Sequence, residues 1–217
     1  MDTLALLQIA WFFLIGILMV GYSILDGFDL GVGILFPFIA REEREREILL
    51  HSIGPVWDGN EVWLLTAGGA LFAAFPIAYA TVFSGMYLAL MLLLFALIFR
   101  AVSLEFWKHD PSRRPLWTAA FSAGSFLPSL LFGVALGNVV TGVPLTPGQE
   151  FAGTFLSLLG PFPLLTGLLG LLAIIIQGAT YTLLKTAGQL RVRAGVVARK
   201  MSPLFIIVFL TSFISAL

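Results

Sequence analysis

Four acidic side chains stand inside or directly beside strongly apolar segments of this 217-residue sequence. Asp26 and Asp29 interrupt an apolar stretch that runs from residue 3 to residue 40, and Asp58 and Glu61 stand at the start of a second apolar segment. An ionised carboxylate at the centre of a membrane costs about 3 kcal/mol on insertion scales, so acids at such depth tend to face protein or water and to carry protons or ions. The residues of each pair are three apart, the spacing that places two side chains on one face of a helix.

Two interpretations of these acids stay open at this point. A carboxylate among apolar neighbours is neutral part of the time, which is the property that a proton relay requires. Alternatively, the acids cap helices, Asp58 especially, or pair with Arg100. The residues alone favour neither interpretation, and the pairing of Asp26 with Asp29 on one face also requires that Gly27 does not break the helix.

Metal chemistry finds little support in the sequence. His51 and His109 lie in or beside basic segments, and neither has a second histidine four residues away. The sequence contains no cysteine, which excludes disulfides, thiolate metal sites and cysteine nucleophiles. We therefore predict that this chain holds no metal ion.

The elements that position the acids must be membrane-spanning helices. Of all residues 59% are hydrophobic and 11% are charged, whereas roughly a quarter of an average soluble domain is charged. The apolar residues form segments of the length that crosses a bilayer, about 20 residues as a helix, and show no strand alternation. The sequence predicts an all-α, polytopic transmembrane helix bundle with about six spans. They lie near residues 6–25, 57–78, 82–99, 117–140, 158–184 and 203–217.

The distribution of charge predicts the orientation of the bundle. The formal net charge is zero, so nothing suggests a nucleic acid partner. The twelve Lys and Arg residues all follow the first, third or fifth predicted span, and the connections at 75–81 and 141–153 carry none. Because basic connections stay in the cytoplasm, the N-terminus is predicted to lie outside.

The connections leave no room for a soluble domain. The longest polar ones, at 100–115 and 185–200, predict loops of about sixteen residues, so residues 1–217 are expected to form one transmembrane domain. The last predicted span, 203–217, would be only about 22 Å long at 1.5 Å per residue, which is shorter than the bilayer core. We therefore expect an N-terminal fragment of a longer chain.

Several ordered motifs resemble a known family, subunit II of the cytochrome bd-type quinol oxidases. The motifs that carry the resemblance are DGFDLGVG at 26–33, WDGNEVWL at 57–64 and TAGGALFAA at 66–74. Shorter matches continue in the same order at 99–100, 133–138 and 177–181. The resemblance therefore covers essentially the whole chain, although family members are usually longer and hold two related four-helix halves.

The resemblance implies a function and a set of site residues. Enzymes of this family oxidise quinol and reduce oxygen to water, taking protons from the cytoplasm, and the haem b and haem d belong to subunit I. Subunit II binds no haem itself, packs against subunit I and contributes carboxylates to a proton path. The matching positions here are Asp26 and Asp58, with Glu61 as their neighbour. The positions with an implied structural or interface role are Asp29, Trp57, Asn60 and Arg100.

The resemblance also implies a location and partners. The chain is expected in the bacterial plasma (inner) membrane, as a subunit of an oxidoreductase without a complete active site of its own. Its expected partners are the haem-bearing subunit I, quinol and membrane lipid, with room for small accessory subunits and a bound quinone. The alternative is a small proton- or ion-coupled transporter, which would also have intramembrane acids and a glycine-interrupted helix.

Overall fold

Eight α-helices and two short 3₁₀ helices make up most of residues 2–216, the part of the chain that the computed structural model describes. The α-helices are α1 (Thr3–Ile39), α2 (Glu43–Ile53), α3 (Trp57–Ala74), α4 (Pro76–Gly85), α5 (Tyr87–His109), α6 (Arg114–Thr141), α7 (Pro161–Lys185) and α8 (Gly188–Ser215). The 3₁₀ helices are η1 (Pro111–Arg113) and η2 (Phe155–Leu159). Within the described residues the β pairing is one isolated bridge, Leu145 with Phe151. The predicted all-α fold class is confirmed.

Within residues 2–216, five helices are long and apolar enough to cross a membrane: α1, α5, α6 with the η1 residues before it, α7 and α8. The second predicted span, 57–78, corresponds to α3 and the first residues of α4. The first turns of α3 carry Asp58, Asn60 and Glu61 and are therefore less apolar. The helix stops at Phe75 because Pro76 cannot donate the backbone hydrogen bond that would continue it. A bundle of about six spans is thus confirmed, and the polar residues of α3 gather in its first turns.

The segments 100–115 and 185–200 were expected to be long polar loops. This prediction is wrong, because most of each segment is helical. The helix α5 continues to His109, α6 already begins at Arg114, and α8 begins at Gly188 rather than near residue 203. Lys and Arg are good helix formers, so a helix continues through charged residues where an apolar segment ends. The helix α1 likewise runs unbroken for 37 residues, through both acids of its predicted pair.

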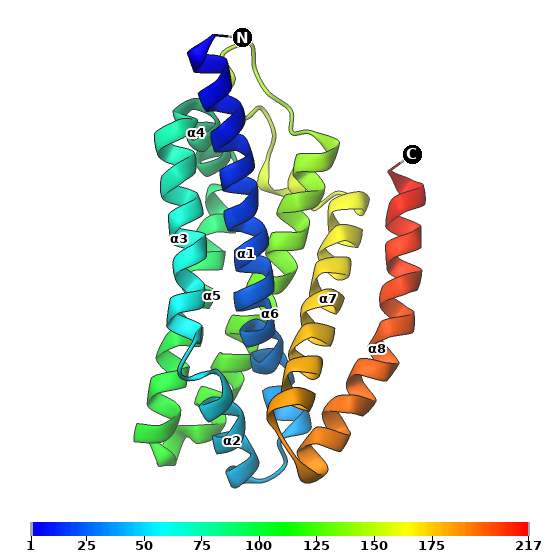
Figure 1. Cartoon of the computed structure of the whole chain (residues 1–217). Coiled ribbons are helices and arrows are strands. Elements are labelled where there is room, and N and C mark those ends of the chain that lie inside the picture. The colour runs from blue at the N-terminus through cyan, green and yellow to red at the C-terminus, as the bar shows by residue number, and fades with distance from the viewer. Residues whose placement is uncertain (1, 217) are drawn as a thin grey trace.

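Close backbone contacts hold the centre of the bundle together. Figure 1 shows α1 running beside α3 on one side and α7 on the other, with α8 packed on the outer side of α7. A Cβ atom added to Gly31 of α1 would lie 2.7 Å from the Cα of Gly178 in α7. Similarly, a Cβ on Gly133 of α6 would lie 2.8 Å from the Cα of Gly167 in α7. Only glycine lets the helices approach this closely at these crossings.

The basic connections gather at one end of the molecule. Figure 1 shows α2 and the α5–α6 and α7–α8 turns at this end, with the N-terminus and the 142–160 connection at the other. Glu43 of α2 pairs with Arg114 of α6, and Glu45 pairs with Arg193 of α8. We call this the basic end. The arrangement agrees with the predicted charge pattern, and the side of the membrane that it faces stays a prediction.

Candidate functional site

Two acids from two helices meet on one buried arginine. Arg100 of α5 has no exposed surface, and its Nη2 atom donates to Oδ1 of Asp26 in α1 at 2.7 Å. Its Nη1 atom donates to Oδ2 of Asp26 at 3.3 Å and to Oε1 of Glu61 in α3 at 2.6 Å. A guanidinium can hold a carboxylate with two parallel hydrogen bonds, which fixes its orientation as well as its charge. We call these residues, with Asp29 and Asn60, the carboxylate cluster.

Asp29 and Asn60 join the same helices one turn nearer the basic end. The amide Nδ2 of Asn60 donates to Oδ2 of Asp29 at 2.7 Å and to the backbone oxygen of Leu25 at 3.2 Å. Both side chains are buried. Two sets of hydrogen bonds therefore join α1 and α3: one runs through the guanidinium of Arg100, and the other through the amide of Asn60.

The cluster keeps spare hydrogen-bonding capacity. Among the described residues, Oη of Tyr22, Oδ1 of Asp29 and Nε of Arg100 are buried and have no hydrogen-bond partner. Tyr22 stands four residues before Asp26 on α1, so the two side chains share a helix face. We did not predict Tyr22 from the sequence, although this spacing could have indicated it.

The charges within the cluster do not balance. One guanidinium faces the carboxylates of Asp26 and Glu61, and Asp29 lies one helical turn away. With all three acids ionised, the cluster would carry two net negative charges, and Asp26 and Asp29 are fully buried, where an uncompensated charge is costly. The arrangement therefore suits a site that holds protons as well as charges.

Asp58 lies apart from the buried side chains. It stands in the first turn of α3, on an exposed part of the surface, and α3 begins without a side-chain capping hydrogen bond. The preceding residue, Trp57, is half-buried against the hydrophobic core. The sequence-predicted residues thus separate into a buried group on Arg100 and Asn60 and one exposed acid, Asp58. Glu61 lies between them, with 24% of its side chain exposed.

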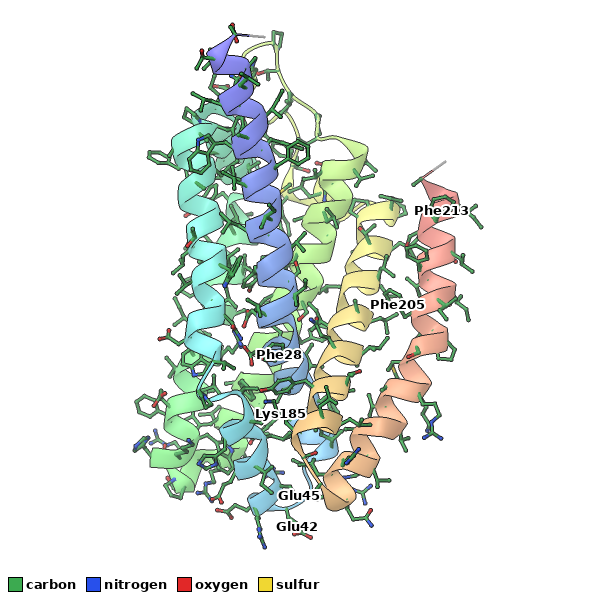
Figure 2. All side chains as sticks on the ribbon, viewed as in Figure 1. Phe28, Glu42, Glu45, Lys185, Phe205 and Phe213 are labelled. Carbon is green, nitrogen blue, oxygen red and sulfur yellow. The ribbon has the colours of Figure 1, made fainter. Side chains whose placement is uncertain are left out.

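The cluster lies in the half of the bundle nearer the basic end. Arg100 is nine residues from the end of α5, about 14 Å along a helix. Figure 2 places Phe28 of α1 at this level and Glu42 and Glu45 beyond it at the basic end. The ring of Phe28 stacks on Tyr181 of α7, whose hydroxyl donates to the backbone oxygen of Ser52 at 2.6 Å. Between the cluster and the basic end, α1 is therefore packed by α7, which in turn is hydrogen-bonded to α2.

The histidines lie outside the buried cluster. Nδ1 of His51 and Nδ1 of His109 each donate to a backbone oxygen of their own helix at 2.8 Å, and both side chains are exposed. Within the described residues, no three His, Cys, Asp or Glu side chains are arranged to hold a metal ion. That this chain binds no metal stays a prediction.

Comparisons with known proteins agree on one family. The family described as cytochrome bd terminal oxidase subunit II matches residues 7–217. The chain is 45% identical over 199 residues to cytochrome bd-I ubiquinol oxidase subunit 2 of Escherichia coli K12, covering 89% of this chain and 52% of that protein. It is 37% identical over 216 residues to cytochrome bd ubiquinol oxidase subunit 2 of Bacillus subtilis, covering 98% and 64%.

The chain thus spans about half the length of the first of these relatives. A chain in the structure of bd oxidase from Geobacillus thermodenitrificans has a similar fold, with a TM-score of 0.80 at 17% sequence identity. The match covers 95% of this chain and 64% of that chain.

Proposed function

Because the chain belongs to the family of cytochrome bd terminal oxidase subunit II and is a multi-pass protein of the bacterial inner membrane, we propose that it is the haem-free subunit of a quinol oxidase. The proposed reaction is the oxidation of quinol coupled to the reduction of oxygen to water. The proposed partner is the haem-bearing subunit I, which holds haem b and haem d and oxidises quinol. This chain stabilises that partner and supplies a proton path from the cytoplasm.

The observation that carries the proposal is the carboxylate cluster in the half of the bundle near the basic end. Oxygen reduction consumes protons, and a path for them needs acids that can hold a proton in a medium where free ions are costly. Arg100 provides the fixed positive charge, and Asp26 and Glu61 share its two nitrogens. A proton that binds one carboxylate leaves the other paired, so the cluster can load and unload without an unpaired arginine.

The exposed face of α3 supports the proposed contact with subunit I. Asp58, Val62, Leu65, Gly69 and Phe72 are all exposed and follow one another at intervals of four and three residues, which places them on one stripe of the helix. Leu65 is 72% exposed. We propose that subunit I covers this stripe. Asp58 then lies at the subunit contact, where it can pass a proton between the cluster and the partner.

The test is Asp58→Asn in the complete complex. Asn keeps the size and most of the hydrogen bonding of Asp but cannot release a proton, so turnover should fall by about 100-fold, a typical contribution of one proton-transfer group. Oxygen consumption with quinol gives the turnover, and an optical spectrum gives the haem content, which should stay normal.

Glu150→Gln is the matched control, because Glu150 is an exposed acid in the 142–160 connection at the opposite end. Its turnover should match that of the unaltered enzyme. Undiminished oxygen consumption in Asp58→Asn, with verified haem content, would rule out the proton role of Asp58.

A further inference from the structure

A groove of about 470 Å³ lies between the last turns of α1 and the first turns of α6, in the half of the bundle nearer the basic end. Its α1 wall is formed by Ile34, Pro37 and Phe38, and its α6 wall runs from Pro115 to Phe126. Phe38 is 72% exposed and Phe126 is 42% exposed, so the groove opens on the outer surface of the bundle. Both walls belong to helices that are long and apolar enough to cross a membrane. We call it the α1–α6 groove.

The lining of the groove offers hydrocarbon contacts and few free hydrogen-bonding groups. Its two polar side chains, Thr118 and Ser122, both bond within the protein. Oγ of Ser122 donates to the backbone oxygen of Ile34 at 3.2 Å, and Oγ1 of Thr118 accepts from Nε1 of Trp107 at 3.1 Å. The other lining side chains are Ala, Pro, Phe and Ile. The groove therefore suits an apolar chain better than a polar ligand.

The length of the groove matches one leaflet of a bilayer. From Pro115 to Phe126 the α6 wall is about 16 Å long at 1.5 Å per residue. The hydrocarbon core of a membrane is about 30 Å thick, so the groove covers about half of it. An acyl chain of a phospholipid spans one leaflet, whereas a helix of another protein that crosses the membrane needs a groove about twice as long. The length thus favours a lipid chain as the occupant.

Two exposed arginines stand where the groove meets the basic end. Arg113 precedes Pro115 by two residues, and Arg41 follows Phe38 by three. Three residues of backbone span at most about 11 Å, and an arginine side chain extends farther still. Positive charge therefore lies at the end of the groove that faces the membrane surface.

An ion pair brings these two arginines to the same end of the groove. The side chain of Glu43, two residues after Arg41, contacts the guanidinium of Arg114, the residue next to Arg113. The start of α2 is therefore held against the start of α6. Because Glu43 and Arg114 neutralise each other, they leave Arg41 and Arg113 as the charges at this end.

The charges of Arg41 and Arg113 are available to a ligand. Among the described residues the side chain of Arg41 has no ion-pair partner. Arg113 is 70% exposed and reaches Oδ2 of Asp110 only at 3.9 Å. The carboxylate of Asp110 already accepts hydrogen bonds from Ser112 at 2.6 Å and from Trp117 at 3.3 Å. Both guanidinium groups can therefore bind an anion.

We propose that the α1–α6 groove binds a phospholipid with an anionic headgroup, with one acyl chain in the groove and the phosphate at Arg41 and Arg113. Guanidinium groups bind phosphate oxygens through charge-assisted hydrogen bonds, and basic residues beside a membrane span attract anionic lipids. This inference goes beyond the proposed function, because it depends on the groove and the membrane and not on a proton path. The bound lipid would join α1, which carries Asp26 and Asp29, to α6.

The test is photo-crosslinking of the complete complex in phosphatidylcholine vesicles that contain a small fraction of phosphatidylglycerol. The phosphatidylglycerol carries a photoactivatable group on one acyl chain, and mass spectrometry locates the labelled peptides. It should label the parts of α1 and α6 that line the groove. Phosphatidylcholine with the same photoactivatable chain should label them roughly tenfold less, because its headgroup has no net charge.

Variants separate the headgroup contact from the acyl-chain contact. Arg41→Gln, Arg113→Gln should lower labelling by phosphatidylglycerol to the level of phosphatidylcholine. The matched control is Arg199→Gln, Lys200→Gln, since these are exposed cations of α8 outside the groove, and its labelling should stay unchanged.

Ala123→Trp fills the groove from an exposed position on α6 and should abolish labelling of the groove by both lipids. A normal haem spectrum shows that each variant has assembled.

Three results would overturn the proposal. Equal labelling by the two lipids would show that the groove does not select an anionic headgroup. Labelling that persists in Arg41→Gln, Arg113→Gln would show that these arginines do not hold it. Absence of groove labelling by either lipid would show that protein covers the groove. None of these results depends on turnover, so they leave the proposed proton path to its own test.

Discussion

At the scale of single residues, Arg100 decides whether the acids can stay buried. Its guanidinium contacts both Asp26 and Glu61, and neither Arg100 nor Asp26 has exposed side-chain surface. Removing one partner of such a buried ion pair leaves an uncompensated charge, which costs more than the intact pair contributes. Arg100 is therefore expected to act on assembly first and on turnover only secondarily.

We predict that Arg100→Ala destabilises the complex by about 3–5 kcal/mol, the usual cost of breaking a buried ion pair. The measurements are the haem content of purified membranes and the thermal unfolding of whatever complex remains, and both should fall. Arg113→Ala is the control, because the Arg113 side chain is 70% exposed and contacts Asp110 only at 3.9 Å. An Arg100→Ala complex with normal haem content and normal melting temperature would show that the acids do not need this charge.

Much of the candidate site could be predicted at this scale. The apolar surroundings of Asp26 and Glu61 indicate buried acids, and Arg100 appears among the expected ion-pair partners. Helical spacing does not reveal that Asp58 points outward while Asn60, two residues later, binds Asp29. That difference depends on which face of α3 meets α1, which only the tertiary packing sets.

At the scale of helices, the crossing of α1 and α7 depends on two glycines. A Cβ on Gly178 would lie 2.5 Å from the Cα of Gly31, and a backbone atom cannot move aside as a flexible side chain can. A hydrogen bond joins the same two helices: the side-chain amide of Gln177 in α7 donates to the backbone oxygen of Ile24 in α1 at 2.7 Å. The crossing is therefore fixed both by shape and by a hydrogen bond.

We predict that Gly178→Ala lowers the stability of the complex by about 1–3 kcal/mol, as overpacking of a tight contact does. Thermal unfolding in detergent gives the change as a lower melting temperature. Gly16→Ala, in the exposed part of α1 with no atom within 4 Å of the added Cβ, should be neutral or slightly stabilising. Equal melting temperatures for Gly178→Ala and the unaltered complex would contradict the close crossing.

The helix α2 contacts α8 through the ion pair between Glu45 and Arg193. Because Glu45 can be protonated, this contact is sensitive to pH. Burial raises the pKa of Glu45, but hydrogen bonds from Arg193 and from the backbone amides of Arg41 and Glu42 outweigh it, so the pKa lies below its ordinary value of 4.5. A carboxyl with a lowered pKa in the folded state contributes stability above its unfolded pKa. This stability is lost as the pH falls below 4.5 and through the lower folded pKa.

We predict that Glu45→Gln lowers the melting temperature at neutral pH and reduces its further fall on acidification. The physical reason is that Gln cannot form the ion pair with Arg193 and has no proton to gain. Thermal unfolding at pH 7 and at about pH 3.5 measures both effects. Glu47→Gln is the control on the same helix, because Glu47 has no ion-pair partner among the described residues. Equal acid sensitivity in Glu45→Gln and the unaltered protein would refute the linkage.

Helix ends were the least predictable feature at this scale. Apolar segments locate the part of a helix that meets lipid, but α5 and α8 continue beyond it through Lys108 and through Arg191 to Lys200. Ion pairs such as Glu45 with Arg193 stabilise these extensions. The sequence shows the charges without showing which of them will pair across helices.

At the scale of the whole molecule, the distribution of charge follows the shape of the bundle. The three connections that carry the basic residues lie at one end in Figure 1, and the connection at 142–160 lies at the other. The span pattern and the alternation of basic connections could both be predicted from the sequence. The position of the carboxylate cluster near the basic end followed from the same two features.

We predict that the basic end faces the cytoplasm, because Lys and Arg near span ends are retained there. Single cysteines at exposed positions Pro147→Cys and Ala187→Cys mark the two ends, and no other cysteine in this chain competes for a label. A membrane-impermeant thiol reagent should label Pro147→Cys in intact spheroplasts and Ala187→Cys only in inverted vesicles. Labelling of both from one side would contradict the arrangement of the helices. Labelling with the sides exchanged would leave the fold intact but would place the carboxylate cluster in the outer half of the membrane, away from the cytoplasm from which the proposed path takes its protons.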